Sequence, residues 1–274
     1  MNQFNLENAP LVSFIPRVKV VILAGGLGSR LSEETTVRPK PMVEIGGLPI
    51  LWHILKGYEH HGFNDFVIAL GYKGEFIKDY FLRYRMLSSN LSLDLSSGKC
   101  ESFCEPVENW KLHLVDTGKD SLTGGRLHRL EPLLKPHGTF MLTYGDGVCD
   151  VDIRKLVEFH KQHGKLATVT AVRPPARFGT MEFDGDRVSD FKEKPQTEGG
   201  WINGGFFVFE PGIFDFLHGD KTVLEEKPLE QLARQGQLMA YKHNDFWQCM
   251  DTVRDKNRLE ELWQTDRAPW KVWA

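Results

Sequence analysis

The chain has 274 residues, of which 41% are hydrophobic, so it is long enough to bury the core of an α/β domain. Lysine and arginine number 34 against 37 aspartates and glutamates, which leaves a net charge of −3. A nucleic-acid binder usually shows a basic excess or a basic stripe, so we expect no nucleic-acid partner. We also expect no membrane association, because no run reaches about 18 apolar residues.

The ends and the cysteines predict the compartment and the domain organisation. Residues 1–17 lack the basic and apolar regions of a signal peptide and are expected to form a mobile lead-in. Cys100 and Cys104 form a pair, but no second pair completes a zinc site, and free thiols are typical of a reducing cytoplasm. We expect a cytoplasmic protein in which residues 18–274 form a single domain with an insertion near 83–110.

Predicted strands and helices alternate along the chain. They are identified from apolar spacing with a period of two or 3.6 residues and from flanking turn residues. In chain order we expect a strand at 18–23, a helix from Pro49 to about Gly62, a strand at 66–70, a helix around 76–81, strands at 112–115 and 139–144, a helix at 153–163, a strand at 165–172, a hairpin of 179–183 and 187–191, a strand at 204–209, and helices at 227–235 and 252–263. Residues 83–109 are polar and irregular, which predicts either a hairpin or an oligomer contact.

This alternation predicts a Rossmann-like, mostly parallel mixed sheet that is flanked by helices on both faces. Ligands of such sheets bind beyond the carboxyl ends of the strands. The turns that follow Leu23, Leu70 and Tyr144 are therefore the first places to look for a site.

The turn after the first strand is rich in glycine. It reads Leu23-Ala24-Gly25-Gly26-Leu27-Gly28-Ser29-Arg30-Leu31. Glycines let backbone N–H groups approach a phosphate closely, and a guanidinium such as that of Arg30 matches phosphate oxygens. The turn is not a Walker A motif, because no Gly-Lys-Ser/Thr follows, and Leu31 stands where a dinucleotide-binding fingerprint would have its third glycine. Taken alone, the glycines are equally compatible with a plain tight turn.

Lys40 lies between Pro39 and Pro41, shortly after the glycine-rich turn. Each proline fixes its own φ and favours an extended conformation in the residue before it. We therefore expect Lys40 in a stiff, non-helical segment that points its charge towards a phosphate. Pro195 would extend Lys194 in the same way.

These motifs together resemble the signature of the sugar-phosphate nucleotidyltransferases, from about Lys19 to the C-terminus. The motifs that carry the resemblance are Leu23–Leu31, Arg38-Pro39-Lys40-Pro41, Asp116-Thr117-Gly118, Thr123-Gly124-Gly125-Arg126-Leu127, Thr143-Tyr144-Gly145-Asp146-Gly147, Asn203-Gly204-Gly205-Phe206-Phe207 and Gln248-Cys249-Met250-Asp251-Thr252. Several are similar to the branch of that family that uses CTP and glucose 1-phosphate. The resemblance implies a nucleotidyltransferase (GT-A-like) fold, transfer of a cytidylyl group with release of pyrophosphate, Mg²⁺ as cofactor, and a homo-oligomer.

The resemblance also implies roles for particular residues. Asp146 and Asp251 would hold the metal, and with Arg30, Lys40 and Lys194 they would form the catalytic set. The nucleotide-binding residues would be Leu23, Ala24, Gly25, Gly26, Gly28, Ser29, Arg30, Lys40, Thr123, Arg126 and Gly145. The sugar phosphate would contact Tyr144, Glu193, Lys194 and Asn203. Cys249 replaces a proline of the family pattern, whereas Thr252 and Asp255 predict a capping box for the last helix.

Three alternatives stay open at this point. A uridylyl- or thymidylyltransferase acting on a hexose 1-phosphate would share the same motifs. A catalytically silent nucleotide-sugar sensor would be expected to lack Lys40 or an acidic ligand, and both are present. A nicotinamide-dependent dehydrogenase is disfavoured by the missing third glycine and by Gly71-Tyr72 at the end of the second strand, where such enzymes place an acidic residue.

Overall fold

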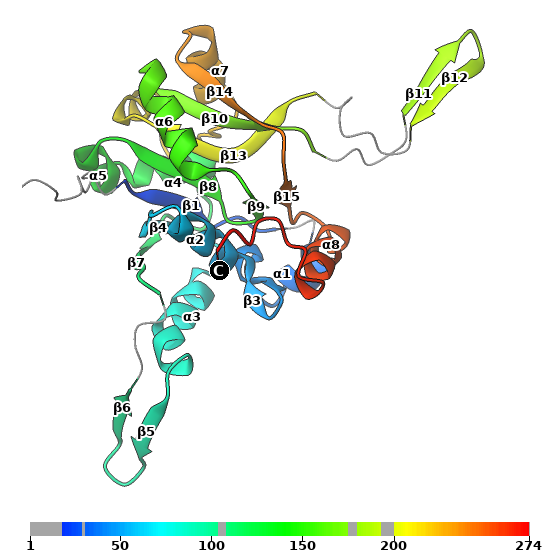
Figure 1. The fold of residues 1–274 in the computed structure, drawn as a ribbon. Coiled ribbons are helices and arrows are strands. Elements are labelled where there is room, and N and C mark those ends of the chain that lie inside the picture. The colour runs from blue at the N-terminus through cyan, green and yellow to red at the C-terminus, as the bar shows by residue number, and fades with distance from the viewer. Residues whose placement is uncertain (1–17, 29–30, 104–107, 175–179, 193–199, 274) are drawn as a thin grey trace, which may run out of the picture.

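The computed structural model describes residues 18–28, 31–103, 108–174, 180–192 and 200–273 (Figure 1). Seven strands form one sheet in the order β14-β10-β13-β8-β1-β4-β7. Their bounds are β1 Val20–Leu23, β4 Asp65–Leu70, β7 Lys111–Asp116, β8 Phe140–Tyr144, β10 Ala167–Val172, β13 Ile202–Phe209 and β14 Leu238–His243. Within this sheet β13 runs antiparallel to β8 and β10, and the other neighbouring pairs are parallel. The predicted mostly parallel mixed sheet is confirmed.

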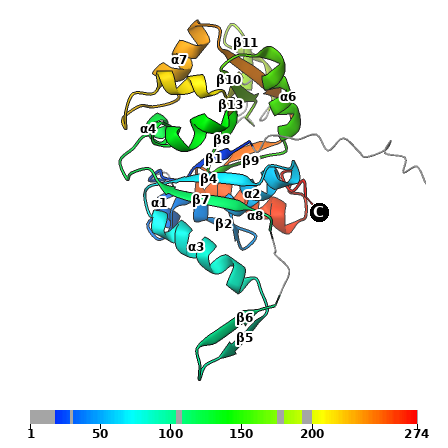
Figure 2. The same cartoon turned by 90° about the vertical axis from the view of Figure 1, so that its left-hand side faces the viewer.

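Helices cover both faces of the sheet (Figure 2). Their bounds are α1 Ser32–Thr35, α2 Ile50–His60, α3 Gly74–Leu87, α4 Thr123–Arg129, α5 Glu131–Leu134, α6 Ile153–His163, α7 Lys227–Arg234 and α8 Val253–Gln264. Short 3₁₀ helices span Lys40–Met42, Lys135–His137 and Pro211–Phe216. No helix within the described ranges is long and apolar enough to span a membrane.

Four small two-stranded sheets complete the described structure. They pair β2 Glu44–Ile45 with β3 Leu48–Pro49, β5 Leu91–Asp94 with β6 Lys99–Ser102, β9 Gly147–Cys149 with β15 Trp247–Cys249, and β11 Thr180–Asp184 with β12 Arg187–Lys192. The sequence predicted an insertion near 83–110 that forms either a hairpin or an oligomer contact. In the structure α3 continues to Leu87, and the β5–β6 hairpin that follows agrees with the first of these alternatives. Helix α3 and this hairpin project from the body as an arm (Figure 1).

Side chains of the central strand β1 point alternately to the two faces of the sheet. Val20 and Ile22 face a core that includes residues of α2, α6 and α8, whereas Val21 and Leu23 face a second core that includes residues of α4, α5 and α7. None of the four is more than 9% exposed. Burial on both faces explains the uninterrupted apolar run from which this strand was predicted.

His53 lies in the first turns of α2 and is only 1% exposed. Its Nε2 is 2.9 Å from the carbonyl oxygen of Ile45, and Trp270 donates from Nε1 to His53 Nδ1 at 3.4 Å. These partners require a neutral ring that is protonated on Nε2, because Nδ1 must accept. Burial lowers the pKa of His53 to about 4, although the carbonyl of Ile45 opposes the shift.

We expect the free energy of unfolding to decrease as the pH falls from about 6.5 to about 4, because the unfolded chain binds a proton on His53 that the folded chain excludes. The folded pKa lies below the unfolded value, so the stabilisation is complete above that window and is lost on acidification. The contribution of His53 to the free energy of unfolding amounts to up to about 3 kcal/mol. Urea unfolding at neutral pH and near pH 4.5 would show a smaller pH dependence for His53→Gln than for the wild type. Equal dependence would contradict the assignment to His53.

Candidate active site

A cleft opens where the carboxyl ends of β1 and β8 meet, in agreement with the rule for parallel sheets. Its volume is about 550 Å³. It is lined by Leu23, Ala24, Gly25, Gly26, Gly28, Lys40, Pro41, Ser121, Leu122, Thr123, Arg126, Tyr144, Gly145, Asp146, Asn203, Trp247, Cys249 and Asp251. The cleft thus brings together every predicted site residue that the structure describes. Ser29, Arg30, Glu193 and Lys194 lie outside the described residues.

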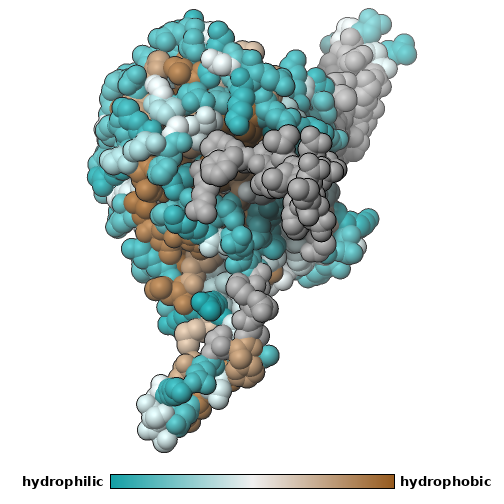
Figure 3. All heavy atoms as spheres, turned by 60° about the vertical axis from the view of Figure 1, so that its left-hand side comes forward, coloured by the Kyte–Doolittle hydropathy of each residue, from teal (hydrophilic) through white to brown (hydrophobic). Residues whose placement is uncertain are grey.

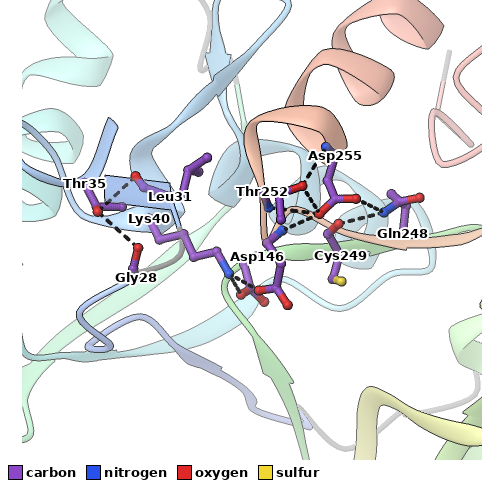
Figure 4. A network of polar contacts seen from close by, with 10 residues as sticks. Gly28, Leu31, Thr35, Lys40, Asp146, Gln248, Cys249, Thr252 and Asp255 are labelled. Atoms are coloured by element: carbon purple, nitrogen blue, oxygen red, sulfur yellow. Dashed lines mark hydrogen bonds and ion pairs between the residues drawn. The ribbon is translucent and has the colours of Figure 1, made fainter. Parts of the chain in front are cut away.

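Lys40 lies between two carboxylates in this cleft (Figure 4). Its Nζ is 2.5 Å from Asp146 Oδ2 and 2.6 Å from Asp251 Oδ1. Burial lowers the pKa of Lys40, but the carboxylates of Asp146 and Asp251 outweigh that effect and the pKa is raised above its ordinary value. The lysine therefore stays charged at neutral pH, and two acids that would otherwise repel each other share one cation.

The two acids are far apart in the sequence and are brought together by a small sheet. Asp146 follows β8 and Asp251 follows β15, and β15 pairs with β9 so that Cys249 lies opposite Gly147. Met250 also donates its backbone N–H to the Asp146 carbonyl at 2.8 Å. This pairing fixes the distance between the two carboxylate-bearing turns.

The capping box predicted for the last helix is confirmed and supports Asp251. The Thr252 hydroxyl accepts from the backbone N–H of Asp255, whose carboxylate accepts in return from the backbone N–H of Thr252 (Figure 4). The same carboxylate accepts from the backbone N–H of Asp251 at 3.2 Å. Cys249, which replaces a proline of the resembled pattern, takes its place in the β9–β15 ladder. Burial and the nearby acids raise the pKa of its thiol to about 11, so the thiol stays protonated.

The backbone at Lys40 differs from the prediction. Pro39 is extended, as expected, with φ −68° and ψ 150°, but Lys40 opens the 3₁₀ helix Lys40–Met42. The expectation of a non-helical Lys40 was wrong because the first residues of a helix need no N–H donor, so Pro41 fits at its second position. Gly145 lets this turn approach, since a Cβ there would lie 2.8 Å from Pro41 Cγ.

The guanidinium of Arg126 is engaged by the protein itself. Arg126 is 4% exposed and reaches from α4 to the loops that follow β1, β4 and β7. Its Nη1 donates to the Leu70 carbonyl at 3.0 Å, the Thr117 hydroxyl at 2.9 Å and the Gly118 carbonyl at 2.8 Å, and its Nη2 donates to the carbonyls of Gly25 at 2.8 Å and Lys119 at 3.3 Å. A Cβ at Gly25 would lie 2.3 Å from the guanidinium carbon. One buried side chain therefore ties together the loops that shape the floor of the cleft.

Glu225 is an acidic residue that the sequence did not single out. It precedes α7, and its carboxylate accepts from the Tyr144 hydroxyl at 2.5 Å and from the Thr123 hydroxyl at 2.6 Å. Asn203 donates from Nδ2 to the Tyr144 oxygen at 3.3 Å. Three predicted site residues are thus connected through one acid on a wall of the cleft. No local pattern marks Glu225, because both of its partners are remote in sequence.

The fold and the cleft define an α/β protein with a polar cleft at the carboxyl edge of a mostly parallel sheet, which is where such sheets bind their ligands. Comparison with known proteins agrees. Residues 19–254 match the sequence family described as Nucleotidyl transferase. The chain is 53% identical over 256 residues to the glucose-1-phosphate cytidylyltransferase of Salmonella typhi, which covers 93% of this chain and 100% of that relative. The chain therefore belongs to the nucleotidyl transferase family, and it is a nucleotidyltransferase.

More distant proteins are similar to this chain in sequence or in structure. The chain is 29% identical over 246 residues to a mannose-1-phosphate guanyltransferase of Neurospora crassa, which covers 87% of this chain and 62% of that relative. The crystal structure of HddC from Yersinia pseudotuberculosis superposes with a TM-score of 0.66 at 26% identity, covering 90% of this chain and 99% of that one.

Proposed function

We propose that this nucleotidyltransferase transfers a cytidylyl group from CTP to glucose 1-phosphate and forms CDP-glucose and pyrophosphate in the cytoplasm. The observation that carries the proposal is the similarity to the Salmonella typhi enzyme, which extends over the whole length of that relative. The meeting of the glycine-rich turn, Lys40 and two carboxylates in one cleft supports the reaction class.

The proposed chemistry is a direct displacement at phosphorus. A phosphate oxygen of glucose 1-phosphate forms a bond to the α-phosphorus of CTP, and the bond from that phosphorus to the oxygen bridging to the β-phosphate breaks. The nucleophile is already an anion, so no general base is needed, and the enzyme contributes positioning and neutralisation of charge. Backbone amides of Gly25, Gly26 and Gly28 would line the nucleotide. Arg30 and Lys40 would neutralise the triphosphate, and Lys194 would hold the attacking phosphate.

The donor atoms of the cleft fit a divalent cation, and we propose Mg²⁺ as the cofactor. Oxygens of Asp146 and Asp251 converge on a single cationic atom, Lys40 Nζ, and carboxylate oxygens are the ligands that Mg²⁺ prefers. Among the described residues no group of three or more His, Cys, Asp or Glu side chains is placed to hold a metal. The two aspartates would therefore share the ion with water and substrate oxygens. When bound, the ion would stabilise negative charge on the α-phosphate and the leaving oxygens.

Lys40 and a divalent cation would compete for the two carboxylates when no nucleotide is bound. We expect Lys40→Met to bind Mn²⁺ on the order of tenfold more tightly than the wild type, because the competing ammonium is gone and two acids are left without it. Titration of the nucleotide-free protein, followed by the electron paramagnetic resonance signal of free Mn²⁺, measures this affinity. Lys78→Met, an exposed lysine on α3, is the matched control. Equal affinities in all three proteins would contradict competition at this point.

The experiment that tests the function is pyrophosphate release from glucose 1-phosphate with CTP, UTP, dTTP, ATP and GTP in turn, with Mg²⁺ and with a chelator. Mg²⁺-dependent release with CTP alone is the expected result. Release with UTP or dTTP instead would retain the mechanism and replace the base assignment. If no nucleotide releases pyrophosphate with this or any other sugar 1-phosphate, the proposal is wrong, and the alternative of a catalytically silent nucleotide-sugar sensor is favoured.

A homo-oligomer is also part of the proposal, and the arm formed by α3 and the β5–β6 hairpin supports it. Leu82, Leu87, Leu93 and Leu95 on this arm are 58–86% exposed, and Figure 3 shows apolar side chains along it. A two-stranded hairpin is marginally stable when it stands alone in water, and exposed apolar patches mark contacts between proteins. A second copy of the chain would bury these leucines. Sedimentation velocity reports the assembly directly.

A further inference from the structure

Hydrogen bonds on the wall of the cleft that carries Tyr144 converge on Glu225 from two sides. The Gly205 backbone N–H donates to Asn203 Oδ1 at 2.8 Å, Asn203 Nδ2 donates to the Tyr144 hydroxyl at 3.3 Å, and that hydroxyl donates to Glu225 Oε1 at 2.5 Å. On the other side of the carboxylate, the Thr123 hydroxyl donates to Glu225 Oε2 at 2.6 Å and accepts from the Leu224 backbone N–H at 2.9 Å. Both outer ends of the series are therefore backbone N–H groups, those of Gly205 and Leu224, which can only donate.

The direction follows from the chemistry of the end groups. A backbone N–H can only donate, so Gly205 fixes the carbonyl end of the Asn203 amide and turns its NH₂ group away. An ionised carboxylate can only accept, so Glu225 accepts the single hydrogen bond that the Tyr144 hydroxyl can donate. The Tyr144 oxygen is left with acceptor capacity alone towards any other partner. The Thr123 hydroxyl has both a donor and an acceptor contact within the protein.

The geometry around Tyr144 is tight enough to hold this arrangement. Gly205 adopts φ +79°, and a Cβ there would lie 2.4 Å from Tyr144 Cδ2, so the ring packs directly on the glycine backbone. Burial and the adjacent Glu225 carboxylate raise the pKa of Tyr144, so the hydroxyl keeps its proton at neutral pH. Asn203 and Tyr144 line the cleft, whereas Glu225 acts through its neighbours.

We propose that Glu225 is a positioning residue that fixes the hydrogen-bond polarity of this wall towards the sugar. Tyr144 then offers a sugar hydroxyl an acceptor, and Asn203 offers a donor from the second proton of its NH₂ group. A hexose 1-phosphate, in which neighbouring hydroxyls can each donate or accept, suits such an alternating pair. This inference rests on the proposed function, because it assigns Tyr144 and Asn203 to the sugar 1-phosphate rather than to the nucleotide.

The test is Glu225→Gln, which keeps the shape of the side chain but replaces one acceptor oxygen with an NH₂ donor. Either Tyr144 or Thr123 must then reverse its hydroxyl or lose its partner. We expect the KM for the sugar 1-phosphate to rise about tenfold, while the KM for the nucleotide and kcat change less than about threefold. Glu226→Gln, the neighbouring exposed acid, should leave all three parameters unchanged. Equal rises in both KM values would overturn the inference, because a purely structural role has no preference for one substrate.

A double-mutant cycle with Tyr144→Phe shows whether Glu225 acts through Tyr144. If it does, Glu225→Gln raises the KM for the sugar phosphate by less than about twofold in the Tyr144→Phe background. Additive effects would overturn the inference even if Glu225→Gln alone raises that KM. The kinetics use the nucleotide and sugar 1-phosphate pair that the wild type turns over. A wild type that prefers another pair thus contradicts the proposed function, and an unselective Glu225→Gln contradicts only the inference.

Discussion

Replacing Asp146 by asparagine is expected to lower kcat about 10³-fold and to change the affinity for sugar 1-phosphate less than about threefold. Asparagine keeps the size of the side chain and removes its charge. The free protein loses one of the two carboxylates that hold Lys40 Nζ, and the proposed metal site loses one of its two protein ligands. Charge that develops on the α-phosphate is then poorly stabilised, whereas the proposed sugar contacts of Tyr144 and Asn203 do not involve the Asp146 carboxylate.

Steady-state pyrophosphate release gives kcat for Asp146→Asn, and isothermal titration gives its affinity for glucose 1-phosphate. Asp215→Asn provides the control, because it removes a charge from an exposed aspartate outside the cleft. Unchanged turnover in Asp146→Asn would show that the Asp146 carboxylate is not a ligand of the catalytic metal. Equal losses in turnover and in sugar binding would indicate that the cleft itself had changed shape.

Arg126→Met is expected to lower the free energy of unfolding by about 3–5 kcal/mol, which is the second of the two largest effects. Methionine has a similar length but no donors, so four backbone carbonyls lose a hydrogen bond. Those of Leu70 and Gly25 keep their bonds from Thr117 and Tyr72, whereas those of Gly118 and Lys119 lose the guanidinium donor. The loops after β1, β4 and β7 also lose the one side chain that is hydrogen-bonded to all three of them.

Urea unfolding measures this effect, and Arg129→Met on the same helix is the matched control. Arg129 is exposed and forms its ion pair with Asp220 at the surface, so its loss should leave the unfolding midpoint almost unchanged. The experiment also separates two roles for Arg126. If the side chain served the nucleotide alone, Arg126→Met would raise the KM for the nucleotide and leave stability intact.

Elements with strong local signals were predicted from the sequence almost residue by residue. Helix α6 was expected at 153–163 and is found there, because Asp152 caps its first turn by accepting from the Lys155 N–H and Gly164 ends it in a left-handed conformation. Edge strand β14 was missed, since its sequence Leu-Met-Ala-Tyr-Lys-His has neither a buried run nor a clear alternation. Only its pairing with β10 makes it a strand.

Helix α4 was missed for a different reason, which is that two glycines near its start disfavour a helix. In the structure these glycines lie within the helix, and a neighbouring segment packs too closely against them to leave room for a side chain. A Cβ at Gly124 would lie 2.7 Å from Thr222 Cγ2, and one at Gly125 would lie 2.1 Å from the Asp220 carbonyl. Contacts of this kind join segments that are remote in sequence, so no local pattern reveals them.

The cleft was predictable to a similar extent. The glycine-rich turn, Lys40 and the two aspartates follow from motifs, and the structure brings them together. The Lys40 contact with both carboxylates, the tie formed by Arg126 and the role of Glu225 required the tertiary structure. In each case, the interacting groups come from helices, strand ends and turns that are remote from one another in the sequence.

The β9–β15 pairing has a consequence for the order in which the protein acquires its chemistry during synthesis. The glycine-rich turn, Lys40 and Asp146 all precede Asp251 in the sequence, so Asp251 is added to the growing chain long after them. A growing polypeptide on the ribosome therefore lacks the second acid at a stage when most strands of its sheet have already been synthesised. The two carboxylates can come together only after β15 has paired with β9, so a segment translated well after Asp146 completes the acid pair of the cleft.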